Sequence, residues 1–194
     1  MLVIIDNGHG KETRGKCSPD GLHREWQWSR EMARRIAGML GGYGIESRLF
    51  VPEERDIPLA ERCRRANKIA GERADAILIS IHNNASGDGS RWLSASGWSA
   101  FVSHNASQNS RRLASLLTAE ALDANLGGNR ATPPCGYWSA NLAICRDTRC
   151  PAVLTENMFQ DCKSDVELIS SEEGKNLIAA IHVNALLKYF NIKK

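Results

Sequence analysis

The chain has 194 residues, of which 42% are hydrophobic and 24% charged, and a formal net charge of +3. This length suits one domain with a full hydrophobic core, so we expect residues 1–194 to form a single domain. The small net charge argues against a nucleic-acid-binding protein, which usually needs a concentrated basic face. No apolar stretch approaches the length of a membrane-spanning helix, and we expect no transmembrane segment.

The N-terminus lacks the pattern of a secretory signal. Met1–Ile5 runs directly into Asp6, with no basic region before the apolar run and no cleavage site after it. We therefore expect cytoplasmic synthesis, followed by release by another route, unless an export signal has been removed from the sequence.

Apolar periodicity predicts strands that alternate with helices along the whole chain. We expect strands at residues 2–5, 45–51, 76–81, 98–103, 142–145 and 151–155, and helices at residues 24–40, 59–70, 107–126 and 172–190. Residues 83–96 and 127–139 read as loops, because Gly, Pro and polar residues are frequent there. This order is typical of the α/β class, here a single mixed, largely parallel sheet sandwiched between helices.

Four residues are candidates for a site at one edge of this sheet. In such sheets the ligand site lies beyond the carboxyl ends of the strands. His9 follows the first predicted strand, His82 the central one and Glu156 a late one, and Glu25 begins the first long helix. Two histidines and one carboxylate meet the ligand requirement of a catalytic zinc site, whose fourth position stays open for water.

Ordinary structural roles remain as alternatives for these residues. The histidines could be hydrogen-bonded residues at strand ends, Glu25 a first-turn helix carboxylate, and Glu156 a structural acid. His23 lies near Glu25 and competes with it as a ligand, although a loop role is the simpler interpretation.

Four separated motifs strengthen the zinc hypothesis. They are Asp6-Asn7-Gly8-His9-Gly10, Glu25 at a helix start, Ser80-Ile81-His82-Asn83-Asn84-Ala85, and Pro151-Ala152-Val153-Leu154-Thr155-Glu156-Asn157-Met158-Phe159. Arg55–Leu59, Arg62 and Ala66-Asn67 match as well. In this order the motifs resemble those of the zinc-dependent N-acetylmuramoyl-L-alanine amidases of the AmiA/AmiB/AmiC and CwlV type.

The resemblance implies a mixed α/β fold and one Zn²⁺ bound by His9, Glu25 and His82, with Glu156 as the catalytic acid/base. It implies bacterial peptidoglycan as the partner, and hydrolysis of the amide that joins the lactyl group of muramic acid to L-alanine. Because no wall-binding repeat is visible, the chain is similar to stand-alone catalytic domains of phage and prophage endolysins. We therefore expect it to act at the cell wall, in the periplasm or outside the cell.

Two segments depart from the family pattern. The usual Glu-Val-Tyr element after the central loop is here Trp98-Ser99-Ala100-Phe101, and the Gly usually found after Glu-x is Met158. We interpret both as changes in substrate contacts rather than in the metal site.

Two other functions stay open from the sequence. A zinc peptidase acting on the stem peptide would use the same metal site, since that site supports the hydrolysis of any amide. A non-catalytic peptidoglycan-binding domain is disfavoured, because all four functional positions carry chemically competent residues.

The remaining candidates have simpler interpretations. We expect the six cysteines to be free thiols rather than a disulfide or a structural zinc site. The run Arg62–Arg65 is predicted to be the solvated side of a helix rather than a phosphate-binding patch. Trp92 and Trp138 fall in predicted loops and are candidates for stacking on sugar rings. The polar loop residues beside His82, including Asn83, either position substrate or form turns.

Overall fold

The computed structural model describes residues 1–193 and contains one six-stranded sheet. Its elements, in chain order, are β1 (Leu2–Asn7), α1 (Glu25–Gly41), β2 (Glu46–Leu49), α2 (Leu59–Glu72), β3 (Ala76–Asn84), β4 (Ser99–Val102), α3 (Gln108–Asp123), β5 (Trp138–Ser139), α4 (Ala143–Arg146), β6 (Ala152–Phe159), α5 (Lys163–Ser170) and α6 (Glu172–Phe190).

The sheet is mixed and its strands lie in the order β2-β1-β3-β6-β4-β5. The four strands from β2 to β6 run parallel to their neighbours, whereas β4 pairs antiparallel with β6 and parallel with β5. The predicted α/β class, with a single largely parallel sheet, is therefore confirmed.

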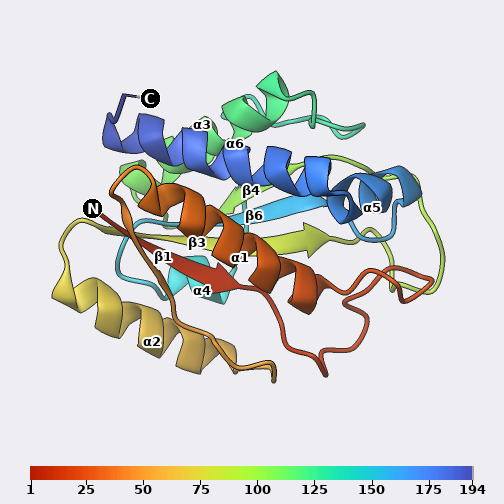
Figure 1. The fold of residues 1–194 in the computed structure, drawn as a ribbon, viewed down its shortest axis with the longest axis horizontal. Coiled ribbons are helices and arrows are strands. Elements are labelled where there is room, and N and C mark those ends of the chain that lie inside the picture. The colour runs from red at the N-terminus through yellow and green to blue at the C-terminus, as the bar shows by residue number, and fades with distance from the viewer. Residues whose placement is uncertain (194) are drawn as a thin grey trace.

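Helices cover both faces of the sheet (Figure 1). Helices α1, α3, α5 and α6 lie on one face, and α2 and α4 lie on the other. Successive residues of β1 point to opposite faces, so Val3 and Ile5 join the larger apolar core while Leu2 and Ile4 join the smaller one. Because β1 and β3 are buried on both faces, their sequences are nearly continuous apolar runs.

The strand register brings the predicted site residues to the same edge. Strands β1 and β3 are paired up to Asn7 and Ile81, and His82 lies opposite Glu156 on β6. The chain leaves β1 just before His9. The carboxyl ends of these three parallel strands therefore meet where the sequence placed the site.

Strands β1, β3 and β6 extend beyond their predicted ends, and the last two carry site residues. β3 continues through His82 to Asn84, and β6 continues through Glu156 to Phe159. Both extensions are polar or mixed, and burial within the sheet rather than apolar periodicity keeps them extended. His82 and Glu156 consequently stand on paired strands and not on loops.

The predicted strand at residues 142–145 is wrong. Ala143–Arg146 forms the one-turn helix α4, which buries Ile144 and Cys145 beneath the sheet. An apolar run of four residues has no periodicity that separates a strand from a helix.

Two short elements were not predicted. Helix α5 lies in a segment where the sequence predicts no helix or strand, and β5 falls inside the expected loop 127–139. Within residues 1–193, no helix is both long enough and apolar enough to cross a bilayer.

Candidate metal centre and active site

Three ligand-type side chains converge at the carboxyl edge of the sheet. Glu25 Oε1 lies 3.3 Å from His9 Nε2 and 3.0 Å from His82 Nδ1, and the two ring nitrogens are 3.2 Å apart. The imidazole planes are nearly perpendicular, at 89°. Within residues 1–193, this is the only group of three or more His, Cys, Asp or Glu residues with ligand atoms close enough to hold one metal ion.

The cluster fits a tetrahedral zinc ion. Ligand atoms that surround zinc at about 2.0–2.1 Å lie about 3.3 Å from one another, close to the spacing observed here. In addition, Glu25 Oε2 is buried without a hydrogen-bond partner, which is costly for a carboxylate unless a cation or a further donor engages it. The donor set of two imidazoles and one carboxylate suits zinc chemically.

The glycines on either side of His9 make this geometry accessible. A Cβ on Gly8 would lie 2.5 Å from the His82 ring, and a Cβ on Gly10 would lie 2.0 Å from the backbone nitrogen of Asp56. His9 itself has a φ of 58°, which lies in the left-handed region and is strained for a residue with a side chain. The turn that presents His9 therefore needs support from its surroundings.

Two arginines provide that support. Arg62 Nη2 and Arg30 Nη1 both donate to the carbonyl oxygen of His9, each at 3.0 Å. Arg62 is 2% exposed and also donates to the carbonyl oxygen of Asn7 at 2.7 Å, while Asp6 pairs with it at 2.8 Å. These contacts fix the chain on both sides of the turn.

This role of Arg62 corrects the prediction that Arg62–Arg65 is a solvated helix face. Arg64 is exposed, and Arg65 pairs with Glu53 and Glu61 as a solvated face would, but Arg62 is buried. The helical period of α2 turns it inward, toward the apolar positions Cys63 and Ala66. The sequence alone does not show which arginine of this run is buried, because four consecutive residues of a helix point to all of its sides.

Glu25 is held by backbone contacts as well as by the histidines. Its Oε1 accepts from the backbone N–H of Asn83 at 3.0 Å. Asn83 is itself buried, with its side chain bonded to His23 at 2.9 Å and to the carbonyl oxygen of Asn157 at 2.6 Å. His23 is thus a structural partner of Asn83 rather than a fourth member of the metal cluster, and Asn83 braces β3 against β6 rather than facing substrate.

The protonation of the cluster follows from its contacts. Burial favours the neutral form of Glu25, but hydrogen bonds from His82 and His9 outweigh burial and hold the pKa of Glu25 well below its ordinary range. Burial also lowers the pKa of His9. For His82 the hydrogen bond and charge of Glu25 outweigh burial and raise its pKa. The cluster therefore presents an ionised carboxylate, as a cation site requires, and a cation would compete with a proton for the ring nitrogen of His82.

Glu156 stands beside this cluster, opposite His82 on β6. Its Oε2 is buried with no hydrogen-bond partner. Burial raises the pKa of Glu156 to about 7, and the nearby charge of His82 opposes that rise. A carboxyl with a pKa near neutrality can both accept and return a proton, which suits a general acid/base.

A cavity of about 530 Å³ opens next to these groups. His9, His82 and Glu156 line it together with Asp6, Lys16, Asp56 and Arg62. The rest of its wall is apolar and comes from the start of α2, from α4 with the residue before it, and from β6, as Ile57, Pro58, Leu59, Leu142, Ala143, Ile144 and Leu154. Neither Lys16 nor the residues of α4 were predicted from the sequence to belong to the site.

Two residues that depart from the family pattern, Trp98 and Met158, lie in the core. Each is only 5% exposed, so these two side chains are not placed to touch a substrate, whereas Ser99 of the same element lies opposite Glu156 on the neighbouring strand. Trp98 Nε1 donates to Asn157 Oδ1 at 2.8 Å. Met158 has a φ of 67° at a register shift between β3 and β6, where β6 carries one more residue than β3. A left-handed residue at this bulge explains why glycine is favoured there.

The other sequence predictions have mixed outcomes. All six cysteines are free thiols, as expected. Trp138 lies in β5 rather than in a loop, and its ring stacks on Phe101 with centroids 6.3 Å apart. Arg130 Cζ lies over the Trp138 ring at 4.8 Å, so this ring already has two partners. Trp92 is 36% exposed and lies on the loop after β3.

Comparison with known proteins finds relatives along the whole chain. The family model described as N-acetylmuramoyl-L-alanine amidase (Amidase_3) matches residues 3–188. The endolysin of Bacillus phage SPP1 is 25% identical over 194 residues, which cover 100% of this chain and 67% of the endolysin. The N-acetylmuramoyl-L-alanine amidase CwlM of Bacillus licheniformis is 27% identical over 196 residues, covering 100% of this chain and 70% of that protein.

Solved structures show the same fold. The N-acetylmuramoyl-L-alanine amidase from Clostridium difficile 630 superposes with a TM-score of 0.84 at 23% identity, covering 100% of this chain and 98% of that one. The catalytic domain of CwlV from Bacillus (Paenibacillus) polymyxa var. colistinus gives a TM-score of 0.81 at 22% identity, with 99% of each chain covered.

Proposed function

The chain belongs to the N-acetylmuramoyl-L-alanine amidase family, and from this premise we propose that it is a zinc-dependent hydrolase of bacterial peptidoglycan. The bond cut is the amide between the lactyl group of N-acetylmuramic acid and L-alanine. The observation that carries the proposal is the pairing, across β3 and β6, of a three-ligand cluster with a carboxyl whose pKa is about 7. The place of action is the bacterial cell wall.

In this proposal His9 Nε2, His82 Nδ1 and a carboxylate oxygen of Glu25 hold the zinc ion. When bound, zinc supplies Lewis acidity that polarises an amide carbonyl and makes water a stronger acid. The arginines hold the backbone of His9, and the N–H of Asn83 holds Glu25, so these contacts would keep the ligands in place.

Glu156 moves the proton. One of its carboxylate oxygens accepts a proton from the attacking water and then delivers it to the amide nitrogen, so that L-alanine leaves as a neutral amine. No covalent intermediate is needed. The apolar wall of the adjoining cavity excludes water from one side of the amide and strengthens these electrostatic interactions.

End-group analysis of a peptidoglycan digest tests this function. Purified sacculi treated with the zinc-loaded protein should release free stem peptides that bear new N-terminal alanine, while the glycan gains no new reducing ends. New amino termini at diaminopimelate or D-alanine would instead identify a peptidase. Binding to the sacculi without any new end group would identify a non-catalytic binding domain.

A further inference from the structure

A single lysine in the cavity has no partner of its own. Lys16 lines the cavity together with His9, His82 and Glu156. The charged residues Asp6 and Asp56, which also line it, are both paired with Arg62. Within residues 1–193, the ammonium group of Lys16 takes part in no hydrogen bond or ion pair. It is therefore the cation in this cavity that is available to a ligand.

The backbone of Lys16 is fixed with respect to the candidate metal ligands. Its carbonyl oxygen accepts from the backbone N–H of Glu25 at 3.1 Å, and the next residue, Cys17, forms an antiparallel bridge with Arg24. Gly15 turns the chain just before it, with a φ of 71°. The segment that carries Lys16 is thus attached to the start of α1, directly beside Glu25.

A second cation near the site is already engaged. The guanidinium of Arg130 lies over the rings of Trp138 and Phe159, at 4.8 Å and 5.5 Å from their centroids. Burial is the main cause of the raised pKa of Glu156, and the positive charges of Lys16 and Arg130 both act to lower that pKa. Both cations therefore lie within electrostatic reach of the candidate acid/base, but only Lys16 lines the cavity.

We propose that Lys16 selects the peptide side of the substrate by pairing with a carboxylate carried by the residue that follows L-alanine. This inference rests on the proposed amidase function. Before cleavage the lactyl carboxyl is itself the acyl group of the amide, so the N-acetylated glycan offers no anion next to the bond. The stem peptide does offer one, wherever the α-carboxylate of its second residue is free and not amidated. A free ammonium beside the reacting groups matches that anion.

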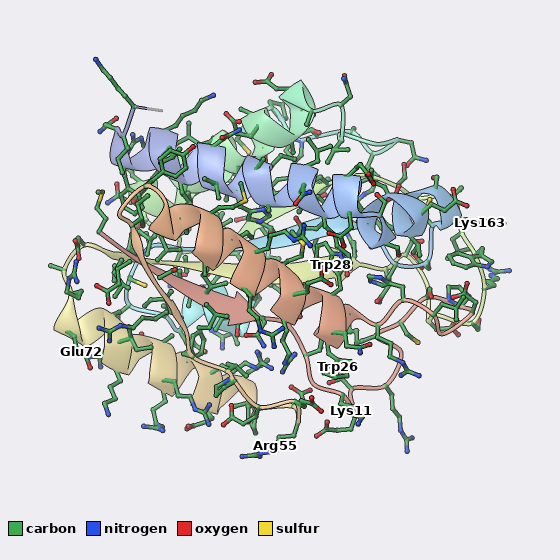
Figure 2. All side chains as sticks on the ribbon, in the orientation of Figure 1. Lys11, Trp26, Trp28, Arg55, Glu72 and Lys163 are labelled. Carbon is green, nitrogen blue, oxygen red and sulfur yellow. The ribbon has the colours of Figure 1, made fainter. Side chains whose placement is uncertain are left out.

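A matched pair of soluble muramoyl peptides tests the proposal. Both substrates carry L-alanine followed by a γ-linked glutamate residue, with the α-carboxylate free in one and amidated in the other. The ratio of their kcat/KM values, measured on zinc-loaded protein, reports the preference for the anion. Lys16→Met removes the charge, and Lys16→Arg keeps it. Lys11→Met is the matched control, because Lys11 is exposed on the same loop (Figure 2) and is not among the residues that line the cavity.

The wild-type protein should favour the acidic substrate by about 10-fold or more, the effect of one charge-assisted hydrogen bond. Lys16→Met should bring the ratio to about 1, chiefly by raising KM for the acidic substrate, while Lys16→Arg and Lys11→Met should keep the preference. An unchanged ratio in Lys16→Met would overturn the proposal. So would an equal fall in kcat on both substrates, which would make Lys16 a stabiliser of the reacting carbonyl instead. If wild-type protein releases N-terminal alanine from neither substrate, the proposed amidase function fails, and this inference falls with it.

Discussion

Arg62 donates a hydrogen bond to the carbonyl oxygen of His9, so a buried guanidinium on α2 holds the strained turn that presents a candidate zinc ligand. The same guanidinium pairs with Asp6, at 2.8 Å, on the strand that precedes the turn. The position of His9 is therefore coupled to α2, which contributes no candidate ligand of its own. This coupling makes metal affinity sensitive to a residue outside the metal cluster.

Replacing Arg62 by Met should weaken both folding and metal binding. It leaves Asp6 buried without its cation, and breaking such a pair typically costs about 3–5 kcal/mol of unfolding free energy. Arg62→Lys keeps the charge but loses the planar guanidinium that reaches several acceptors. This variant should therefore remain folded but bind zinc more weakly. Arg64→Met, on the exposed side of the same helix, is the control and should change neither property. Competition with a chelator measures zinc affinity, and unchanged affinity in folded Arg62→Lys would contradict this role.

At Met158 a glycine variant should be more stable than an alanine variant, which is the reverse of the order expected within a helix. Both variants lose a buried side chain, at a cost of about 2–5 kcal/mol in unfolding free energy. Met158→Gly also relieves the left-handed backbone, which is worth about 1–2 kcal/mol, so it should be the more stable of the two. At the fully buried Met32 in α1, glycine should instead be worse than alanine by about 1 kcal/mol. Urea unfolding of the four variants measures their unfolding free energies. If glycine is less stable than alanine at both positions, the backbone at the bulge is not strained.

His182 should make the fold sensitive to mild acid. It is fully buried on α6, where its ring bonds Thr155 at 3.0 Å and the carbonyl oxygen of Ile178 at 2.8 Å. Burial lowers the pKa of His182 to about 4 from its ordinary value of 6.5. Between these values the unfolded chain binds more protons than the native one, so stability is complete above pH 6.5 and falls as the pH drops toward 4.

From pH 7 to pH 5 this residue should remove about 2 kcal/mol of unfolding free energy. His182→Gln has no ring that titrates, so between pH 7 and pH 5 it should lose about 2 kcal/mol less unfolding free energy than the wild-type protein. The comparison uses urea unfolding of both proteins at the two pH values. Equal pH dependence in the two proteins would show that His182 does not stay neutral in the native state.

The metal cluster predicts about one zinc per chain after purification. His82→Ala removes one of three ligands and should leave little zinc bound, whereas His104→Ala alters an exposed histidine outside the cluster and should keep it. Elemental analysis of dialysed protein measures the ratio. Full zinc occupancy in a His9→Ala/His82→Ala double variant would exclude this site.

The sequence predicted the fold class and the edge at which the site lies, because both depend on apolar runs and on the residues that come directly after them. Leu2–Ile5 and Ala76–Ile81 are unambiguous buried strands, and parallel strands end at the same edge. The convergence of His9, Glu25 and His82 could be anticipated in this way. Their separation of about 3 Å could not, since it depends on side-chain rotamers and on the clearance left by Gly8.

Features that arise from tertiary packing escaped prediction. Nothing in the run Arg62–Arg65 separates its buried member from its exposed ones, because the partner Asp6 lies 56 residues away. The four-residue apolar segment that forms α4 is too short to show a period. Met158 could be noticed as a departure from the family pattern, but only the backbone of β6 shows that the departure concerns strain rather than substrate.

The most direct test of the account is the rate at which the zinc-loaded Glu156→Gln variant releases N-terminal alanine from peptidoglycan, measured together with its zinc content. Glutamine keeps the shape of the side chain but cannot accept a proton. We predict that zinc content stays at the wild-type level while turnover falls by about 10²–10⁴-fold. Near-normal turnover with zinc bound would contradict the account, because Glu156 would then not move the proton. Loss of zinc would contradict it as well, because it would make Glu156 a ligand.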